Sequence, residues 1–317
     1  MPLSLEQYAN YLDKREDLPW PAAPLATPIK ARPHLARLPG VRAVLWNVYG
    51  TLLATPQGEF LFEHPTPFVM SSALDKTLHE FRMWASMSRK PGQPADDLLR
   101  QYRQVLSEQS LGGNGERHPE VQAEQVWAVI LKRLMQKDYR FDLGFFGAMN
   151  EYSRKVAYFF HASLQGTACY EGAAAALRHV SASGLRQGLL ADGQCFTTLQ
   201  LQRGLSAQDG SARLDDLLSP SLVVLSCDLR GKKPSERLFR KALDDLQSEG
   251  VSPEEILHVG SRMHQDIIPA RRLGMRTALF AGDKASLQAT ADQLKDSATR
   301  PDVLLTELDQ ITEVVGS

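Results

Sequence analysis

Residues 42–52 read RAVLWNVYGTL, a short apolar run that passes directly into the turn signal Tyr49-Gly50-Thr51. Such a run, bounded by turn residues, is typical of a strand buried on both faces of a sheet. Similar runs recur at 186–191 (RQGLLA), 222–226 (LVVLS), 256–260 (ILHVG), 276–280 (RTALF) and 303–306 (VLLT). Helical patterns at 171–183, 195–204, 235–249 and 265–273 alternate with them. This alternation predicts an α/β fold with a Rossmann-like parallel sheet and right-handed crossovers.

The stretch between the first two strands has a different character. Apolar residues recur at helical spacing through 72–88, 95–110, 118–137 and 143–163, with Pro/Gly-rich breaks at 90–94 and 111–115. We therefore expect an inserted all-helical cap at 60–165, with aromatic residues such as Trp84, Trp127 and Phe159 in its own core. The Rossmann-like core then takes 41–59 and 166–317.

Residues 1–40 form a third region. Ser4 and Gln7 make a capping box for a helix near 5–14, and six prolines follow between Pro19 and Pro39. Prolines at this spacing favour an extended path. We interpret the proline-rich arm as a strap over the core surface, with a partner-docking arm as the alternative.

Charge and cysteine content limit the possible partners. The chain carries 36 basic and 37 acidic residues, so no basic field is available for nucleic acid or an anionic membrane. The three cysteines are far apart and form no C-x-x-C pair, which favours a reducing compartment. With no apolar run of membrane-spanning length and no signal-like segment at the N-terminus, we expect a soluble cytoplasmic protein.

Four segments at predicted strand ends carry a family resemblance. They are NVYGTL at 47–52, LLADG at 189–193, GKKP at 231–234, and HVGS at 258–261 continuing to Asp266. In this order and spacing they resemble the haloacid dehalogenase (HAD) superfamily. The resemblance covers about 40–55 and 166–317, and it implies that the helical insertion takes the place of the family's C1 cap.

The resemblance also implies a chemistry for the first segment. Phosphatases of the family read Asp-x-Asp-Gly-Thr, where the first Asp is the covalent nucleophile and the second a general acid/base. Here these two catalytic positions hold Asn47 and Tyr49. An amide is neutral and its nitrogen lone pair is delocalised, so Asn47 is not a useful nucleophile.

Two positions are similar to those of the 2-haloacid dehalogenases. That branch reads Asp-x-Tyr-Gly-Thr-Leu, matching Tyr49, and it has a serine where phosphatases place the first acid of the fourth motif, matching Ser261. Dehalogenases also need the Asp nucleophile that Asn47 replaces.

The remaining positions are mixed. Lys233 matches the family lysine that neutralises the nucleophile and the substrate anion, and Thr51 matches the threonine of the first motif. Among the substrate-binding positions, Ala191 lacks the usual hydroxyl, and Asp192 replaces the usual Asn. A carboxylate at Asp192 would repel an anionic ligand by roughly 4 kcal/mol at about 4 Å and an effective dielectric near 20.

Magnesium binding is weakened by the same substitutions. The resemblance implies ligands from the nucleophile Asp, from the backbone carbonyl two residues later, and from carboxylates of the fourth motif. Of those carboxylates only Asp266 is kept, and Ser261 stands at the other position. We expect no cofactor, with magnesium at Asp266 as the alternative.

Charge balance leads to a geometric prediction. Asn47 removes the negative charge beside Lys233, so we expect Lys233 to pair with Asp192, Asp266 or both.

From these substitutions we expect a HAD-like pseudoenzyme that binds a small molecule or a protein. The alternatives are an active phosphatase- or dehalogenase-like hydrolase with Asp192 or Asp266 as base, and an interaction protein that works through its proline-rich arm.

Overall fold

The computed structural model describes residues 1–87, 94–111 and 115–316 and contains a six-stranded parallel sheet. Its strands are β1 (Ala43–Trp46), β4 (Arg186–Ala191), β5 (Val223–Leu225), β6 (Ile256–Gly260), β7 (Arg276–Phe280) and β8 (Val303–Leu305). Their order is β5-β4-β1-β6-β7-β8, so β1 is central between β4 and β6. The predicted α/β class is confirmed.

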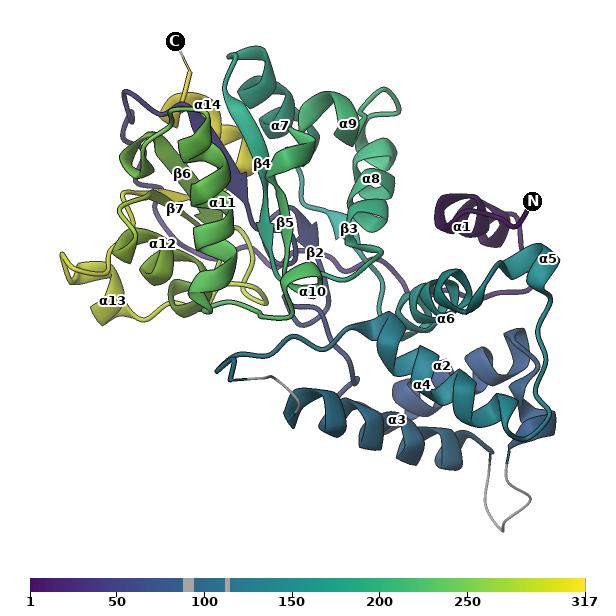
Figure 1. Ribbon diagram of the computed structural model, residues 1–317. Coiled ribbons are helices and arrows are strands. Elements are labelled where there is room, and N and C mark those ends of the chain that lie inside the picture. The colour runs from purple at the N-terminus through teal and green to yellow at the C-terminus, as the bar shows by residue number, and fades with distance from the viewer. Residues whose placement is uncertain (88–93, 112–114, 317) are drawn as a thin grey trace.

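Helices cover both faces of this sheet (Figure 1). Val44 and Trp46 pack towards α7 (Ala173–Ala182), α8 (Thr197–Gln208) and α14 (Ile311–Val314). Ala43 and Leu45 point to the opposite face, towards α11 (Glu236–Ser248) and α12 (Ile268–Arg272). The shorter helices are α9 (Leu214–Leu217), α10 (Ser226–Leu229) and α13 (Ala291–Lys295). The alternation of side chains along β1 therefore supplies two separate apolar layers.

The insertion lies beside the sheet and has a hydrophobic core of its own. Its helices are α2 (Pro67–Glu80), α3 (Pro94–Leu111), α4 (Ala123–Met135), α5 (Leu143–Phe146) and α6 (Met149–Leu164). Within the described part of 60–165 there is no strand. A short antiparallel pair, β2 (Leu53–Ala54) with β3 (Ala168–Cys169), lies where the insertion leaves and rejoins the core. The predicted breaks at 90–94 and 111–115 lie mostly outside the described residues.

Two predictions about the insertion were wrong in detail. Trp84 is 59% exposed rather than part of the core. The helix expected over 72–88 ends at Glu80, and Arg82 takes a left-handed conformation (φ 51°), so Trp84 no longer follows the apolar stripe of α2. The helix expected from 118 begins only at Ala123, because the preceding segment pairs with the core.

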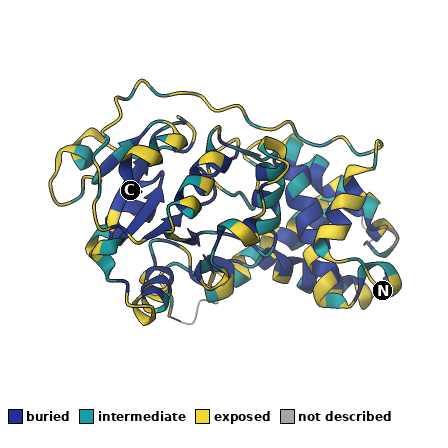
Figure 2. Ribbon diagram, turned by 90° about the horizontal axis from the view of Figure 1, so that it is seen from above, coloured by how far each residue is buried: buried dark blue, intermediate teal, exposed yellow. Residues whose placement is uncertain are grey.

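The N-terminus folds as its capping residues predict. Helix α1 (Leu5–Asp13) begins at Ser4, whose hydroxyl accepts from the Gln7 backbone while the Gln7 side chain accepts from the Ser4 backbone. The arm that follows is extended and largely exposed, and it runs along one edge of the molecule to β1 (Figure 2). Within the described ranges, no helix has the length and apolar character needed to cross a membrane.

Candidate functional site

Asn47 lies immediately after β1, at the carboxyl end of the central strand, where ligands of open α/β sheets bind. Its side chain is buried and donates hydrogen bonds to the Tyr49 carbonyl oxygen (2.9 Å) and to Thr51 Oγ1 (3.3 Å). Its amide oxygen accepts from Lys233 Nζ (2.8 Å). The opposite amide orientation would place nitrogen against an ammonium and oxygen against a carbonyl, so these partners determine the assignment of oxygen and nitrogen.

Lys233 is buried beside Asn47, with its side chain 1% exposed. Its ammonium donates to Asp266 Oδ1, to Asn47 Oδ1 (2.8 Å) and to the Leu190 carbonyl oxygen (3.3 Å). An ammonium has three N–H donors, so these contacts use all of them. The predicted pairing of Lys233 with Asp266 is confirmed.

Asp266 is held as an ionised carboxylate. Its Oδ2 accepts from the backbone N–H groups of Ser261 (3.1 Å) and Arg262 (3.0 Å), so Ser261 contributes its backbone to the network. Burial alone would raise the pKa of Asp266, but Lys233 and the neighbouring His258 together outweigh burial and hold the pKa well below its usual value. Burial lowers the pKa of His258, whose Nδ1 contacts the Leu45 carbonyl oxygen (3.1 Å). Its Nε2 lies 3.7 Å from Asp266, which is too far for a hydrogen bond.

Asp192 takes a different position from the one expected. Its Oδ1 accepts from the backbone N–H of Lys233 (2.7 Å), not from the ammonium. Burial raises the pKa of Asp192, and Lys233 partly offsets that rise. Of the two carboxylates expected as partners of the ammonium, only Asp266 pairs with it, because the side chain of Asp192 instead anchors the loop that carries Lys233. The preceding Ala191 is fully buried at the end of β4.

Tyr49 points away from these residues. Its hydroxyl donates to Gln200 Oε1 (2.6 Å) and lies 2.9 Å from Thr197 Oγ1, and both partners belong to α8. Burial raises the pKa of Tyr49, and its ring packs against Phe60 at 5.3 Å between centroids. Tyr49 thus links the first motif to α8 and supplies no proton donor to the strand ends.

The residues at the strand ends do not fit a magnesium ion. The backbone carbonyl of Tyr49 accepts the amide of Asn47, Asp266 Oδ1 accepts Lys233, and Asp266 Oδ2 accepts two backbone N–H groups. These are the oxygens that the family resemblance assigns to the metal, and each already has a donor. Across 1–87, 94–111 and 115–316, no three His, Cys, Asp or Glu side chains group in a way that could hold a metal.

A segment of the insertion, residues 116–123, lies across the loops that follow β4 and β5. Pro119 pairs with Gly231 in an antiparallel bridge, and Gln194 both accepts from the Ala123 backbone (2.8 Å) and donates to the Val121 carbonyl (2.9 Å). The Gln122 side chain donates to a backbone carbonyl of α10 (2.9 Å). This docking explains why the segment is not helical.

The same segment brings in Glu120, which the sequence reasoning missed. Ser226 Oγ donates to Glu120 Oε2 (2.5 Å) and accepts from the Gly193 backbone (2.9 Å). Burial raises the pKa of Glu120 to about 7, against the effect of the Ser226 hydrogen bond, and nearby Asp192 adds to the rise. Ser226 is the last residue of the predicted strand at 222–226 and could have been found by its place at a strand end, whereas Glu120 lies far away in the sequence and carries no such signal.

Comparisons with known proteins agree with this architecture. A family described as HAD-hydrolase-like matches residues 231–311. The glyceraldehyde 3-phosphate phosphatase of Pyrococcus furiosus is 33% identical over 146 residues, which are 45% of this chain and 53% of that protein. The rhythmically expressed gene 2 protein of Drosophila melanogaster is 30% identical over 69 residues, 22% of this chain and 26% of that protein. The chain thus spans about half the length of the first of these relatives and about a quarter of the second.

The structural comparison concerns the fold. The 2-haloacid dehalogenase from Pseudomonas syringae pv. Tomato DC3000 is similar with a TM-score of 0.52 and 18% identity, covering 86% of this chain and 97% of that one. Similarity at this identity supports a common arrangement of sheet and helices and leaves the chemistry to be argued from the site.

Proposed function

The chain belongs to the HAD-like superfamily, and from this premise we propose that it is a binding or scaffold protein that does not use the covalent Asp chemistry of its hydrolase relatives. Asn47 stands at the nucleophile position and Tyr49 at the acid/base position. Neither side chain offers the group that the corresponding step needs. The ligand would be a small molecule or a protein.

One observation carries the proposal: the buried amide of Asn47 donates to the Tyr49 carbonyl while it accepts from Lys233. In a hydrolase of this superfamily, the oxygens at these positions would hold a cation and the lysine would face an anion. Here an amide N–H stands in for the cation and a carboxylate side chain, Asp266, for the anion. A network that is already neutral and hydrogen-bonded has little tendency to take up a phosphate or a carboxylate.

The test is an activity and binding panel on the purified full chain. With magnesium present, a generic aryl phosphate and a series of 2-haloacids should be turned over no faster than background, and inorganic phosphate should give no calorimetric signal. Lys232→Met changes an exposed neighbour of the buried Lys233, and this variant should give the same results as the wild type in both assays. Turnover of about 1 per second or faster would place the protein in the ordinary enzyme range and overturn the proposal.

A second candidate is a hydrolase in which Asp192 activates water. The observation in its favour is that Asp192 is partly exposed and its pKa is raised, as a general base near neutral pH requires. Asp266 is a poor base because its pKa is held low by Lys233. A measurable hydrolytic rate that is lost in Asp192→Asn, with unchanged melting temperature, would favour this candidate.

A further inference from the structure

The first forty residues make contacts with both parts of the molecule. We propose that α1 and the proline-rich arm act as an intramolecular strap that holds the helical insertion against the sheet, so that release of α1 from the core exposes the strand ends. This inference goes beyond the proposed function and holds whether the strand ends bind a ligand or catalyse a reaction.

Helix α1 packs first against the insertion. Tyr8, Ala9 and Leu12 are buried and belong to the same hydrophobic cluster as the insertion's helices. The Tyr8 ring lies 6.4 Å from Phe81, and the Leu3 backbone donates to the Phe145 carbonyl (3.1 Å).

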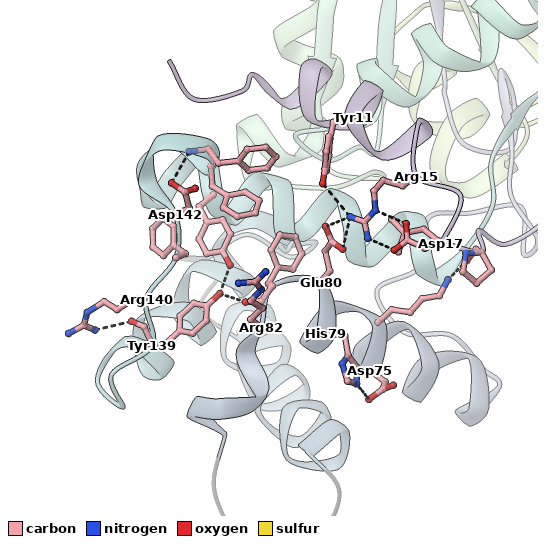
Figure 3. Close-up of a pocket in the computed structure, with 18 residues that line it drawn as sticks. Tyr11, Arg15, Asp17, Asp75, His79, Glu80, Arg82, Tyr139, Arg140 and Asp142 are labelled. Carbon is pink, nitrogen blue, oxygen red and sulfur yellow. Dashed lines mark hydrogen bonds and ion pairs between the residues drawn. The ribbon is translucent and has the colours of Figure 1, made fainter.

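A group of ion pairs just after the end of α1 also binds it to the insertion. Arg15 reaches Glu80 at the end of α2 (3.2 Å) and also binds Asp17 (2.6 Å), as Figure 3 shows. In that view Tyr11, Arg15, Asp17 and Glu80 lie close together, and they line part of a cavity of about 760 Å³ between α1 and the insertion. Burial and ion pairing thus fasten α1 to the insertion at both of its ends.

The opposite side of α1 faces α8 of the sheet domain. Arg203 forms an ion pair with Asp13 and donates to Asn10 Oδ1 (3.2 Å). The side chains of Arg203 and Asp13 are 31% and 51% exposed. Exposed ion pairs are weak and easily broken, so the contact between α1 and Arg203 is the one that breaks when α1 leaves the sheet domain.

The arm continues over the place where the insertion rejoins the core. Lys76 of α2 donates to the Pro19 carbonyl, and Trp20 lies edge-on to Phe159 of α6 at 5.4 Å. At Gly166, a Cβ atom would lie only 2.2 Å from the Ala22 carbonyl oxygen, so the arm sits directly on this crossing.

Backbone hydrogen bonds then fasten the arm to the sheet domain. The Lys284 backbone donates to the Thr27 carbonyl (2.8 Å), and the Thr27 backbone donates to Asp283 Oδ1 (2.9 Å). His34 and Leu304 exchange two backbone hydrogen bonds (3.0 and 2.9 Å), which adds the arm to the free edge of β8. The arm is therefore anchored at both ends, and α1 extends it across the boundary between insertion and core.

This arrangement restricts the motion of the insertion. The chain crosses between the two parts at the segments beside β2 and β3, and rotation about two neighbouring crossings is the usual hinge motion of such a domain. The strap is a further connection on another side of the molecule. Any opening of this kind must separate α1 from Arg203 or from the insertion, and the exposed contact to Arg203 is the weaker.

The test is hydrogen exchange on the full chain, followed in peptides that cover 47–54 and 226–235. Arg203→Asp should speed exchange there by about two- to fivefold, the factor that corresponds to losing an exposed ion pair. Adding Asp13→Arg restores a pair of opposite charges and should return the exchange to the wild-type rate. Arg240→Asp, an exposed residue paired within α11, is the matched control and should have no effect.

Two results would overturn the proposal. One is wild-type exchange at 47–54 and 226–235 in Arg203→Asp, because α1 would then hold nothing closed. The other is faster exchange in the insertion's own core helices α4 and α6 as well, because that would indicate general destabilisation instead of opening.

Discussion

Lys233→Met removes the ammonium that pairs with Asp266 in the buried network at the strand ends, while keeping a side chain of similar length. Asp266 then keeps two backbone N–H donors but loses its ammonium partner, and its side chain is 0% exposed. Breaking a buried ion pair by removing one partner costs about 3–5 kcal/mol. For a chain of this size we expect the melting temperature to fall by roughly 5–15 °C.

The pKa of Asp266 determines how the effect of Lys233→Met on the melting temperature should change with pH. In the wild type the pKa of Asp266 is held low, so its stabilising contribution is present above its ordinary pKa and is lost only as the pH falls well below it. Without Lys233, burial dominates and raises the pKa of Asp266. Its ionisation then opposes folding as the pH rises, so the difference in melting temperature between wild type and variant should widen from pH 4 to pH 7.

The assay is thermal unfolding by calorimetry at several pH values, with two controls. Lys232→Met removes a neighbouring exposed lysine and should leave the melting temperature almost unchanged. Adding Asp266→Asn to Lys233→Met removes the stranded charge and should recover part of the loss. If Lys233→Met and Lys232→Met have the same melting temperature at every pH, Lys233 is not part of a closed network and this reasoning fails.

Three further changes test other parts of the molecule. Asn47→Asp should lower the unfolding free energy by about 1–3 kcal/mol, because a carboxylate oxygen would face the Tyr49 carbonyl in place of an N–H donor. The same variant should leave aryl phosphate hydrolysis at background, since Tyr49 supplies no acid. Glu120 has a pKa of about 7 against an ordinary value of 4.5. Its contribution to the free energy of unfolding is therefore full below pH 4.5 and is lost as the pH rises through 7. Glu120→Gln, which keeps an acceptor, should remove up to about 3 kcal/mol of that pH dependence, read from melting temperatures between pH 4.5 and 8. Gly166→Ala would place a methyl group 2.2 Å from a backbone oxygen of the arm and should cost about 1–3 kcal/mol, whereas Gly210→Ala, with open space around it, should be neutral by the same measurement.

The sheet could be predicted because its strands are short apolar runs that end in turn residues, and such runs depend little on distant parts of the chain. The same strand-end rule brought Asn47, Asp192, Lys233 and Asp266 to one edge of the sheet. Charge balance alone predicted that Lys233 pairs with Asp192, Asp266 or both, since a buried ammonium needs a counter-charge wherever it lies, but it did not choose between the two carboxylates.

The remaining features depend on contacts between distant residues. Tyr49 turns towards α8 because Gln200 and Thr197 satisfy its hydroxyl, and nothing near Tyr49 in the sequence reveals those partners. Likewise, residues 118–122 have helical periodicity, yet they pair with the loop at Gly231, so a tertiary contact overrides the local preference. The position of Trp84 depends on the left-handed backbone at Arg82, which helical spacing cannot indicate.

The substitutions at the strand ends are mutually dependent, which is why they are better understood as one change than as separate losses. A carboxylate at position 47 would need a cation to face the Tyr49 carbonyl, whereas an amide satisfies that carbonyl by itself. Once the amide is there, Lys233 has lost a counter-charge on that side and can be neutralised by Asp266. Both oxygens of Asp266 then already accept hydrogen bonds, one from Lys233 and the other from two backbone N–H groups. On the proposed function, the covalent Asp chemistry would therefore require the nucleophile, an acid/base and a free Asp266 together, and we expect a single substitution to produce a less stable protein before it produces an active one.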